Sequence, residues 1–136
     1  MEQERKLNPM TIKSFTDLEQ SKKLVEFLPL ESADMFYSPV PVREWKDKTD
    51  ISKGTHVVFK DRIFVIKDLP NHEIGEGDVY AWSLAALLDI YPMVVGRDMD
   101  MYCCWQNHKN LHSKHYNNPI DACVEMIEKL HKQNIL

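Results

Sequence analysis

The sequence of 136 residues predicts an α+β fold, with an antiparallel sheet and about three helices packed mainly on one of its faces. Helical and strand-like segments follow one another in an order that contains few β-α-β units. The strand-like segments are rich in β-branched and aromatic residues. Apolar residues make up 43% of the chain and charged residues 28%, which is the composition of an ordinary globular domain.

Domain organisation is expected to be simple. Residues 13–136 have the length of a single domain, and residues 1–12 are expected to form a poorly ordered lead-in. The lead-in has mixed charge and no apolar run, so we do not expect a secretory signal. No stretch of the sequence approaches the length of a membrane span. We therefore expect no membrane association and a cytoplasmic location.

The first two expected helices differ in character. Thr16 and Glu19 have the spacing of a capping box, and Pro29 is expected to end the helix that follows them. The segment Ser83–Ile90 is apolar on nearly all sides, which predicts a short buried helix that ends before Pro92.

The last helix has the clearest signals. Asn118 is a good capping residue, and Pro119 suits the first helical turn. Apolar side chains then recur at helical spacing, which predicts a buried stripe formed by Ile120, Cys123, Val124, Ile127 and Leu130. Because it lies on this stripe, Cys123 is expected to be an inert core thiol.

The expected strands fall in two regions. Residues 55–59 and 62–66 predict a β-hairpin that turns at Lys60-Asp61, and residues 34–37 predict a partner strand. The connection 38–54 contains Pro39, Pro41 and Trp45, so we expect it to be irregular. Residues 91–95 predict one more short strand.

A second hairpin is expected at residues 100–107 and 111–116, with a two-residue turn at Lys109-Asn110. That turn places Cys104 opposite His115, and directly opposed side chains have Cβ atoms ~5 Å apart. A thiol and an imidazole at this separation can act as a nucleophile and its base. Cys104 and His115 are therefore the candidate catalytic residues.

The same stretch has the side chains that zinc prefers, since the metal binds imidazole and thiolate ligands. The candidate metal ligands are Cys104, His108, His112 and His115. Neither a CxxC nor an HExxH spacing is present. The alternative is a polar hairpin tip whose cysteines act as small hydrophobic residues. We expect no cofactor, unless this stretch binds zinc.

The sequence offers two further binding hypotheses. Between residues 101 and 120 there is no acidic side chain, and aromatic residues lie near Lys109 and Lys114, a pattern that can bind single-stranded nucleic acid. The net charge of −4 and the lack of arginine in this stretch argue against it. A separate acidic loop, which could bind a hard cation but lacks EF-hand spacing, contains Asp68, His72, Glu73, Glu76 and Asp78.

The sequence lacks the common catalytic motifs. It has no glycine-rich phosphate loop, no Rossmann fingerprint and no GxSxG motif, and the whole chain contains 4 glycines. The three cysteines, an odd number with two adjacent, are a poor disulfide framework. We therefore predict a non-enzymatic protein-binding or accessory module. Its candidate contact residues are Trp45, Trp105, Lys109 and Tyr116.

Three blocks of the chain, Glu31–Met35, Trp82–Leu88 and Asn118–Cys123, carry a resemblance. In this order they resemble a family of small uncharacterised proteins from gut anaerobic bacteria and their phages or other mobile elements. The blocks are packing and capping motifs, and the resemblance brings no catalytic residue with it. It implies a cytoplasmic accessory protein.

Overall fold

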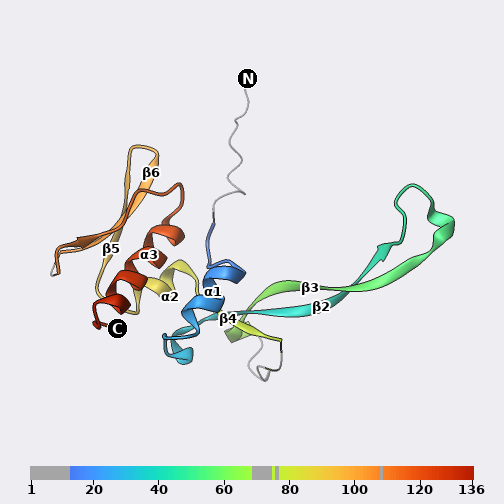
Figure 1. Ribbon diagram of the computed structural model, residues 1–136, viewed down its shortest axis with the longest axis horizontal. Helices are drawn as coiled ribbons and strands as arrows, with labels where there is room; N and C mark the ends of the chain where they lie inside the picture. Colours follow the sequence, from blue (N-terminus) through green and yellow to red (C-terminus); the bar gives the residue numbers. More distant parts are fainter. Residues whose placement is uncertain (1–12, 69–74, 76, 108) are drawn as a thin grey trace.

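The computed structural model describes residues 13–68, 75, 77–107 and 109–136. Within them the chain forms three α-helices and two three-stranded antiparallel sheets (Figure 1). The predicted α+β class is confirmed, with the strands divided between two sheets. The expected lead-in at residues 1–12 lies outside the described residues. No helix in the described part of the chain has the length and apolar character needed to cross a membrane.

Helix α3 (Pro119–Lys132) forms the centre of the core. It begins as predicted, because the side chain of Asn118 accepts a hydrogen bond of 2.8 Å from the backbone N–H of Asp121. The whole predicted stripe is buried, together with Ala122 and Met126. Each large aliphatic side chain on it contributes about 1.5–3 kcal/mol of hydrophobic stabilisation. The helix packs against the second sheet and against α2.

The N-cap of helix α1 (Leu18–Leu24) is one residue later in the chain than predicted. Asp17 is the cap: its side chain accepts from the N–H of Gln20 at 2.7 Å, and the side chain of Gln20 accepts from the N–H of Asp17 at 3.1 Å. Thr16 does not cap, because its Oγ1 is buried and accepts a hydrogen bond of 3.1 Å from the N–H of Trp82. Thr16 therefore binds a distant segment of the chain, and Asp17 caps the helix in its place.

Helix α2 (Leu84–Leu88) begins at the predicted position and is capped by Ser83. The hydroxyl of Ser83 accepts from Ala86 and donates to Asp34. Only Leu87 in this helix is fully buried, so the expectation of a helix buried on all sides was too strong. Short 3-10 turns lie elsewhere, at η2 (Leu30–Ser32), η3 (Ile51–Lys53) and η4 (Ile66–Asp68).

The second sheet has the order β5-β6-β7 and is covered on one face by α3. Its strands are β5 (Val94–Asp98), β6 (Met101–Gln106) and β7 (Leu111–His112). The predicted hairpin is present, but its register differs by two residues, because Trp105 pairs with His112. The connection is longer than the predicted two-residue turn, and the side chain of Gln106 accepts from the N–H of Lys109 across it.

The first sheet has the order β3-β2-β4, with strands β2 (Met35–Trp45), β3 (Thr55–Val65) and β4 (Val79–Ala81). The predicted hairpin turn at Lys60-Asp61 is wrong. Strand β3 continues straight through these residues and pairs with β2 along its whole length. Segment 38–45, expected to be irregular because of its prolines, is the strand that pairs with it.

Pro39 and Pro41 are compatible with β2 because that strand has one open edge there. Strand β4 pairs with β2 only from Met35 to Tyr37, so the rest of β2 has β3 as its single neighbour. Residues two apart in a strand direct their backbone nitrogens to the same side. The missing N–H groups of both prolines are therefore tolerated at the open edge, where they also hinder pairing with a further strand.

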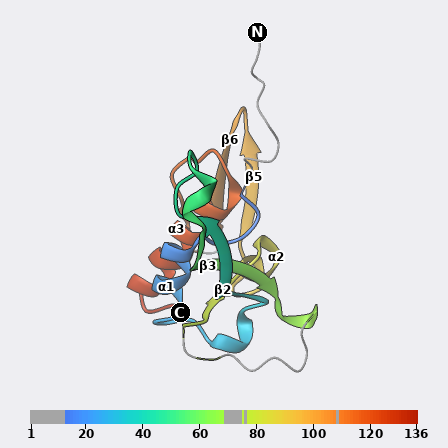
Figure 2. The same cartoon turned by 90° about the vertical axis from the view of Figure 1, so that its right-hand side faces the viewer.

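The β2–β3 ribbon beyond Tyr37, residues 38–62, projects away from the helices and from the second sheet (Figure 1). We call it the arm. Figure 2 views the molecule from the side toward which the arm extends. Its strands run for about 26 Å at ~3.3 Å per residue. A two-stranded ribbon is at best marginally stable in water, so the arm depends on contacts across its own faces and on whatever covers them.

Packing in the second sheet generates one prediction. The indole of Trp105 lies over Gly96, where an added Cβ would lie 2.7 Å from its Cη2 atom. Gly96→Ala should therefore lower the free energy of unfolding by about 1–3 kcal/mol in urea denaturation. Gly75→Ala is the control, because a Cβ there meets no atom within 4 Å. Equal stability of the two variants would contradict this packing.

Candidate binding surface

One face of the arm is covered by its own side chains. Successive residues of a strand point to opposite faces, so Val42 and Val58 share one face with Glu44 and Lys60. Lys60 and Glu44 form an ion pair that spans the Val42–Val58 pair. The aliphatic stems of these charged side chains cover the two valines, which are half-buried. This face presents its charged groups to water.

The opposite face has no such cover. We call it the apolar arm face, formed by the exposed residues Pro41, Trp45, Val57 and Phe59. The Phe59 side chain is 70% exposed and that of Trp45 is 49% exposed. Pro41 pairs with Phe59, so the patch lies at the middle of the arm. A contiguous exposed apolar patch marks an interaction site more often than isolated apolar residues do.

Two opposite charges lie on the same face as this patch. Arg43 lies on the tip side of Phe59, between Pro41 and Trp45 on β2, and pairs with Val57, whereas Asp61 lies on the other side of Phe59, away from the tip, and pairs with Pro39. Both side chains are exposed and belong to the same face as Phe59. Arg43 donates a hydrogen bond of 3.2 Å to the hydroxyl of Thr55. The apolar arm face, taken together with these two charges, is therefore electrically neutral.

The arm as a whole is mildly basic. Residues 38–62 contain six cationic and four acidic side chains, which give a net charge of +2, so the rest of the chain carries −6. The excess of positive charge lies at the tip, with Lys46, Lys48 and Lys53, and on the opposite face. Lys53 is paired with Asp47 at 3.2 Å.

The structure separates the members of the cysteine- and histidine-rich stretch. Cys104 is fully buried in the core, where its thiol interacts with that of Cys123. This interaction and burial both raise the pKa of the Cys104 thiol. A neutral buried thiol is a weak nucleophile, because the thiolate is the reactive form.

The predicted pairing of Cys104 with His115 is wrong. Ser113 is the actual partner: its N–H donates to the carbonyl of Cys104 at 2.7 Å, and the N–H of Cys104 donates to its hydroxyl at 2.9 Å. The His115 side chain is exposed, and its Nε2 lies 3.5 Å from a carboxylate oxygen of Asp98. The shifted hairpin register accounts for the difference.

The candidate metal ligands also have different surroundings. His112 is exposed, and its Nδ1 lies 3.2 Å from the carbonyl of Ser113, whereas Cys104 is in the core. His108 lies outside the described residues. Among those described, no three His, Cys, Asp or Glu side chains are grouped so as to hold a metal ion.

Most of the acidic loop lies outside the described residues as well, including His72, Glu73 and Glu76. Of its described members, Asp68 ends the turn η4, and Asp78 accepts a hydrogen bond of 2.9 Å from the N–H of Gly75.

The four candidate contact residues lie in separate places. Trp45 is on the apolar arm face, and Lys109 is exposed in the connection between β6 and β7. Trp105 is half-buried over Gly96 on the outer face of the second sheet. Tyr102 and Trp105 are an odd number of residues apart on β6 and so point to opposite faces. They do not form a shared stacking surface for nucleic-acid bases.

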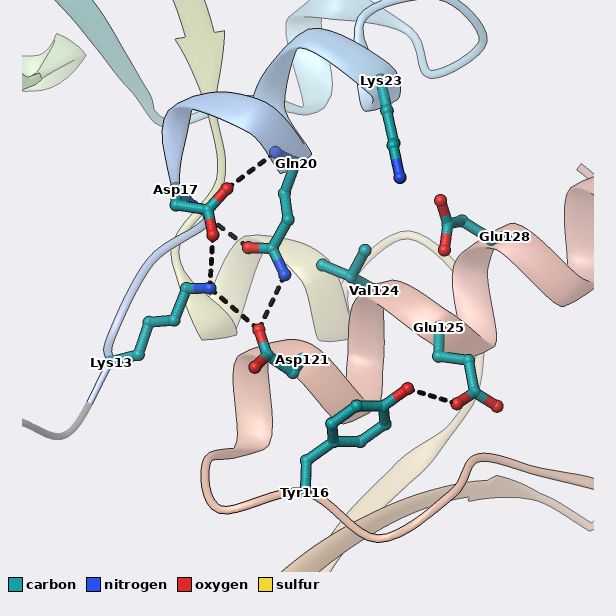
Figure 3. Close-up of a pocket in the computed structure, with 9 residues that line it drawn as sticks. All are labelled: Lys13, Asp17, Gln20, Lys23, Tyr116, Asp121, Val124, Glu125 and Glu128. Atoms are coloured by element: carbon teal, nitrogen blue, oxygen red, sulfur yellow. Dashed lines mark hydrogen bonds and ion pairs between the residues drawn. The ribbon is translucent and has the colours of Figure 1, made fainter.

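Tyr116, the fourth candidate, points into a polar depression of ≈ 240 Å³ between α1 and α3 (Figure 3). Its hydroxyl donates to a carboxylate oxygen of Glu125 at 2.6 Å. That hydrogen bond, together with partial burial, raises the pKa of Tyr116 to about 12. Burial acts to raise the pKa of Glu125, but hydrogen bonds from Tyr116, Lys129 and Lys114 outweigh it and lower the pKa.

The other side of the depression is a set of contacts that we call the α1–α3 clamp, formed by Lys13, Asp17, Gln20 and Asp121. Lys13 binds Asp17 at 2.7 Å and Asp121 at 2.8 Å, and Gln20 donates to Asp121 at 2.7 Å (Figure 3). Burial acts to raise the pKa of Asp121, but these hydrogen bonds and one from Asn118 lower it. Because these polar groups form hydrogen bonds with one another, the contacts in the depression hold α1 against α3. The depression lacks the apolar lining that is typical of a ligand pocket.

Sequence reasoning missed the main part of the binding surface. Val57 and Phe59 were assigned to a hairpin, and Pro41 and Arg43 to an irregular connection. The sequence pattern that could have predicted this surface is the alternation of side chains between the two faces of β2 and β3. It becomes visible only when the two segments are paired with each other.

Comparison of the chain with protein-family models, with curated proteins and with solved structures finds no match. The function is therefore inferred from the geometry of the arm and of the rest of the described chain, which we call the body.

Burial of the thiols generates a prediction. Cys103, Cys104 and Cys123 are buried, so in the folded protein at neutral pH they should react with Ellman's reagent far more slowly than a free thiol does. All three should react at once after unfolding in guanidinium chloride, which serves as the control. A thiol that reacts at the free-thiol rate in the folded protein would restore the cysteine nucleophile hypothesis.

Asp121 of the α1–α3 clamp and the neighbouring Glu125 predict a loss of stability in acid. Folding lowers the pKa of Asp121 below 3.8 and that of Glu125 below 4.5, so the unfolded chain binds more protons in this range. Their stabilising contribution is complete above these ordinary values. It is lost as the pH falls through the lower pKa values of the folded protein. The free energy of unfolding should therefore decrease between about pH 5 and pH 3.

Urea denaturation across this pH range tests the assignment. Asp121→Asn should flatten the pH dependence, whereas Asp89→Asn, outside the clamp, should leave it unchanged. Identical pH profiles for the two variants would show that Asp121 does not carry the effect.

Proposed function

We propose that this protein is a non-enzymatic protein-binding module with an accessory role, and that the apolar arm face is its contact surface. The observation that carries the proposal is the exposure of Phe59 and Trp45 on a ribbon that projects from the body. Aromatic side chains are enriched in the cores of protein interfaces. On the free ribbon they are in contact with water, and a protein partner would remove them from it.

The charge distribution favours a protein over a nucleic acid. Nucleic acids bind through several lysine and arginine contacts to phosphates on one surface. The apolar arm face has one arginine, Arg43, and one carboxylate, Asp61, so it offers no basic surface. The cations at the tip are interspersed with Asp47 and Asp50.

The chemistry of the body supports a non-enzymatic role. Cys104, the candidate nucleophile, is buried beside Cys123, and His115 lies at the surface near Asp98. The polar depression between α1 and α3 consists of side chains that bind one another and hold the two helices together. The resemblance of the packing motifs supports an accessory role in the cytoplasm of a bacterium, or within a phage or mobile element.

Site-specific photocrosslinking tests the proposal. A benzophenone side chain at position 59 should form a discrete adduct with a protein when the full chain is expressed and irradiated in cells. The control is the same side chain at position 56, which lies nearby on the covered face of the arm. The adduct should appear from position 59 only, and mass spectrometry then identifies the partner. No adduct from position 59, or equal adducts from both positions, would overturn the proposal.

A further inference from the structure

We infer that the partner of the apolar arm face is a second copy of this chain, and that two arms pack face to face in an antiparallel, two-fold symmetric dimer. This inference rests on the proposed function, since it names the partner of the same surface. A two-fold interface requires a self-complementary patch, in which each residue that contacts a second residue is contacted by it in return. The arm has such a patch.

Self-complementarity comes from the order of residues along the arm. The pair Pro41–Phe59 lies at the centre, with the Pro39–Asp61 pair on the body side and the Arg43–Val57 pair on the tip side. When two arms stack antiparallel about this centre, the distal end of each lies over the proximal end of the other. Arg43 of each copy is then brought toward Asp61 of the second copy. The two charges gain partners of opposite sign, with Pro41 and Phe59 between them, while Trp45 lies on the tip side of Arg43.

Charge at the tip selects the antiparallel arrangement over the parallel one. The tip has three lysines and two aspartates, Asp47 and Asp50. A parallel stack would bring two cationic tips together, and would also place Arg43 beside Arg43 and Asp61 beside Asp61. An antiparallel stack separates the tips by the length of the arm and removes both like-charge contacts.

The edges of the arm favour association through its face. Pro39 and Pro41 hinder strand pairing at the open edge of β2. The outer edge of β3 carries the consecutive charged residues Lys60, Asp61 and Arg62, which discourage the addition of another strand. With both edges protected in this way, stacking of one ribbon on another at ~10 Å is the remaining way to cover the apolar side chains.

The available area matches a weak, reversible dimer. An aromatic side chain offers 150–250 Å², so Phe59 and Trp45 at their exposures of 70% and 49% present roughly 200–300 Å² per arm. Two arms double this value, and Pro41, Val57 and the stem of Arg43 extend it toward the ~1,000 Å² needed for a specific interface. We therefore expect a dissociation constant near the micromolar range.

Sedimentation velocity of the full-length protein across a concentration series tests the dimer. The wild type should shift from monomer to dimer as concentration rises. Phe59→Ser should weaken dimerisation by about 30-fold or more, as removal of a central aromatic anchor does. Met99→Ser is the matched control, because Met99 is 88% exposed in the turn between β5 and β6, outside the arm, and its change should leave the dimer unchanged.

Charge reversal tests the antiparallel geometry itself. Arg43→Asp and Asp61→Arg each create two like-charge contacts in a two-fold dimer, so each alone should weaken it by about 10-fold. The double variant restores opposite charges and should recover most of the affinity. Arg62→Asp, on the covered face, is the control for a general change in charge. Failure of the double variant to recover affinity overturns the antiparallel arrangement.

The two proposals fail in different ways. A wild type that stays monomeric at all concentrations overturns the dimer. If position 59 then crosslinks to a different protein, the binding module stands with another partner. A concentration-dependent dimer lost in Phe59→Ser, with circular dichroism unchanged, supports both proposals.

Discussion

Burial of one face of helix α3 is the interaction on which the body depends. In a chain of this size a single 14-residue helix buries seven side chains and meets the second sheet and α2. Polar contacts hold neighbouring segments against α3. The α1–α3 clamp ties the segment before α1 to Asp121, and Tyr116 and Lys114 bind Glu125 on the same helix. The buried thiols contribute to the same core, since the Cys104 thiol of β6 interacts with the Cys123 thiol of α3.

The arm obeys a different constraint, because it has no core of its own. Its stability comes from cross-strand contacts such as the Lys60–Glu44 ion pair, which covers Val42 and Val58 on one face. The other face leaves Phe59 and Trp45 in water. A ribbon of this kind gains stability when its exposed face is covered, so structure and binding are linked in the arm. The chain therefore combines a body that has a buried core with an extension whose apolar face is exposed.

Local signals were sufficient where the deciding contacts are local. Asn118 and Pro119 start α3 because capping needs only neighbouring backbone groups, and the stripe from Ile120 to Leu130 follows helical periodicity. Such signals failed where distant segments compete. Thr16 was predicted to cap α1, but it binds Trp82 instead. Lys60-Asp61 looked like a turn, yet pairing with β2 keeps those residues extended.

The sequence by itself determined the α+β class, the main helix and its buried face, and the absence of familiar catalytic motifs. Tertiary structure alone decided which strands pair, and with that the site. Pairing of β2 with β3 places Pro41 beside Phe59 and puts Arg43 and Asp61 on the same face. A register shift of two residues removes His115 from Cys104. The physical reason is that strand pairing joins residues far apart in the chain, and its energy depends on contacts that no local pattern specifies.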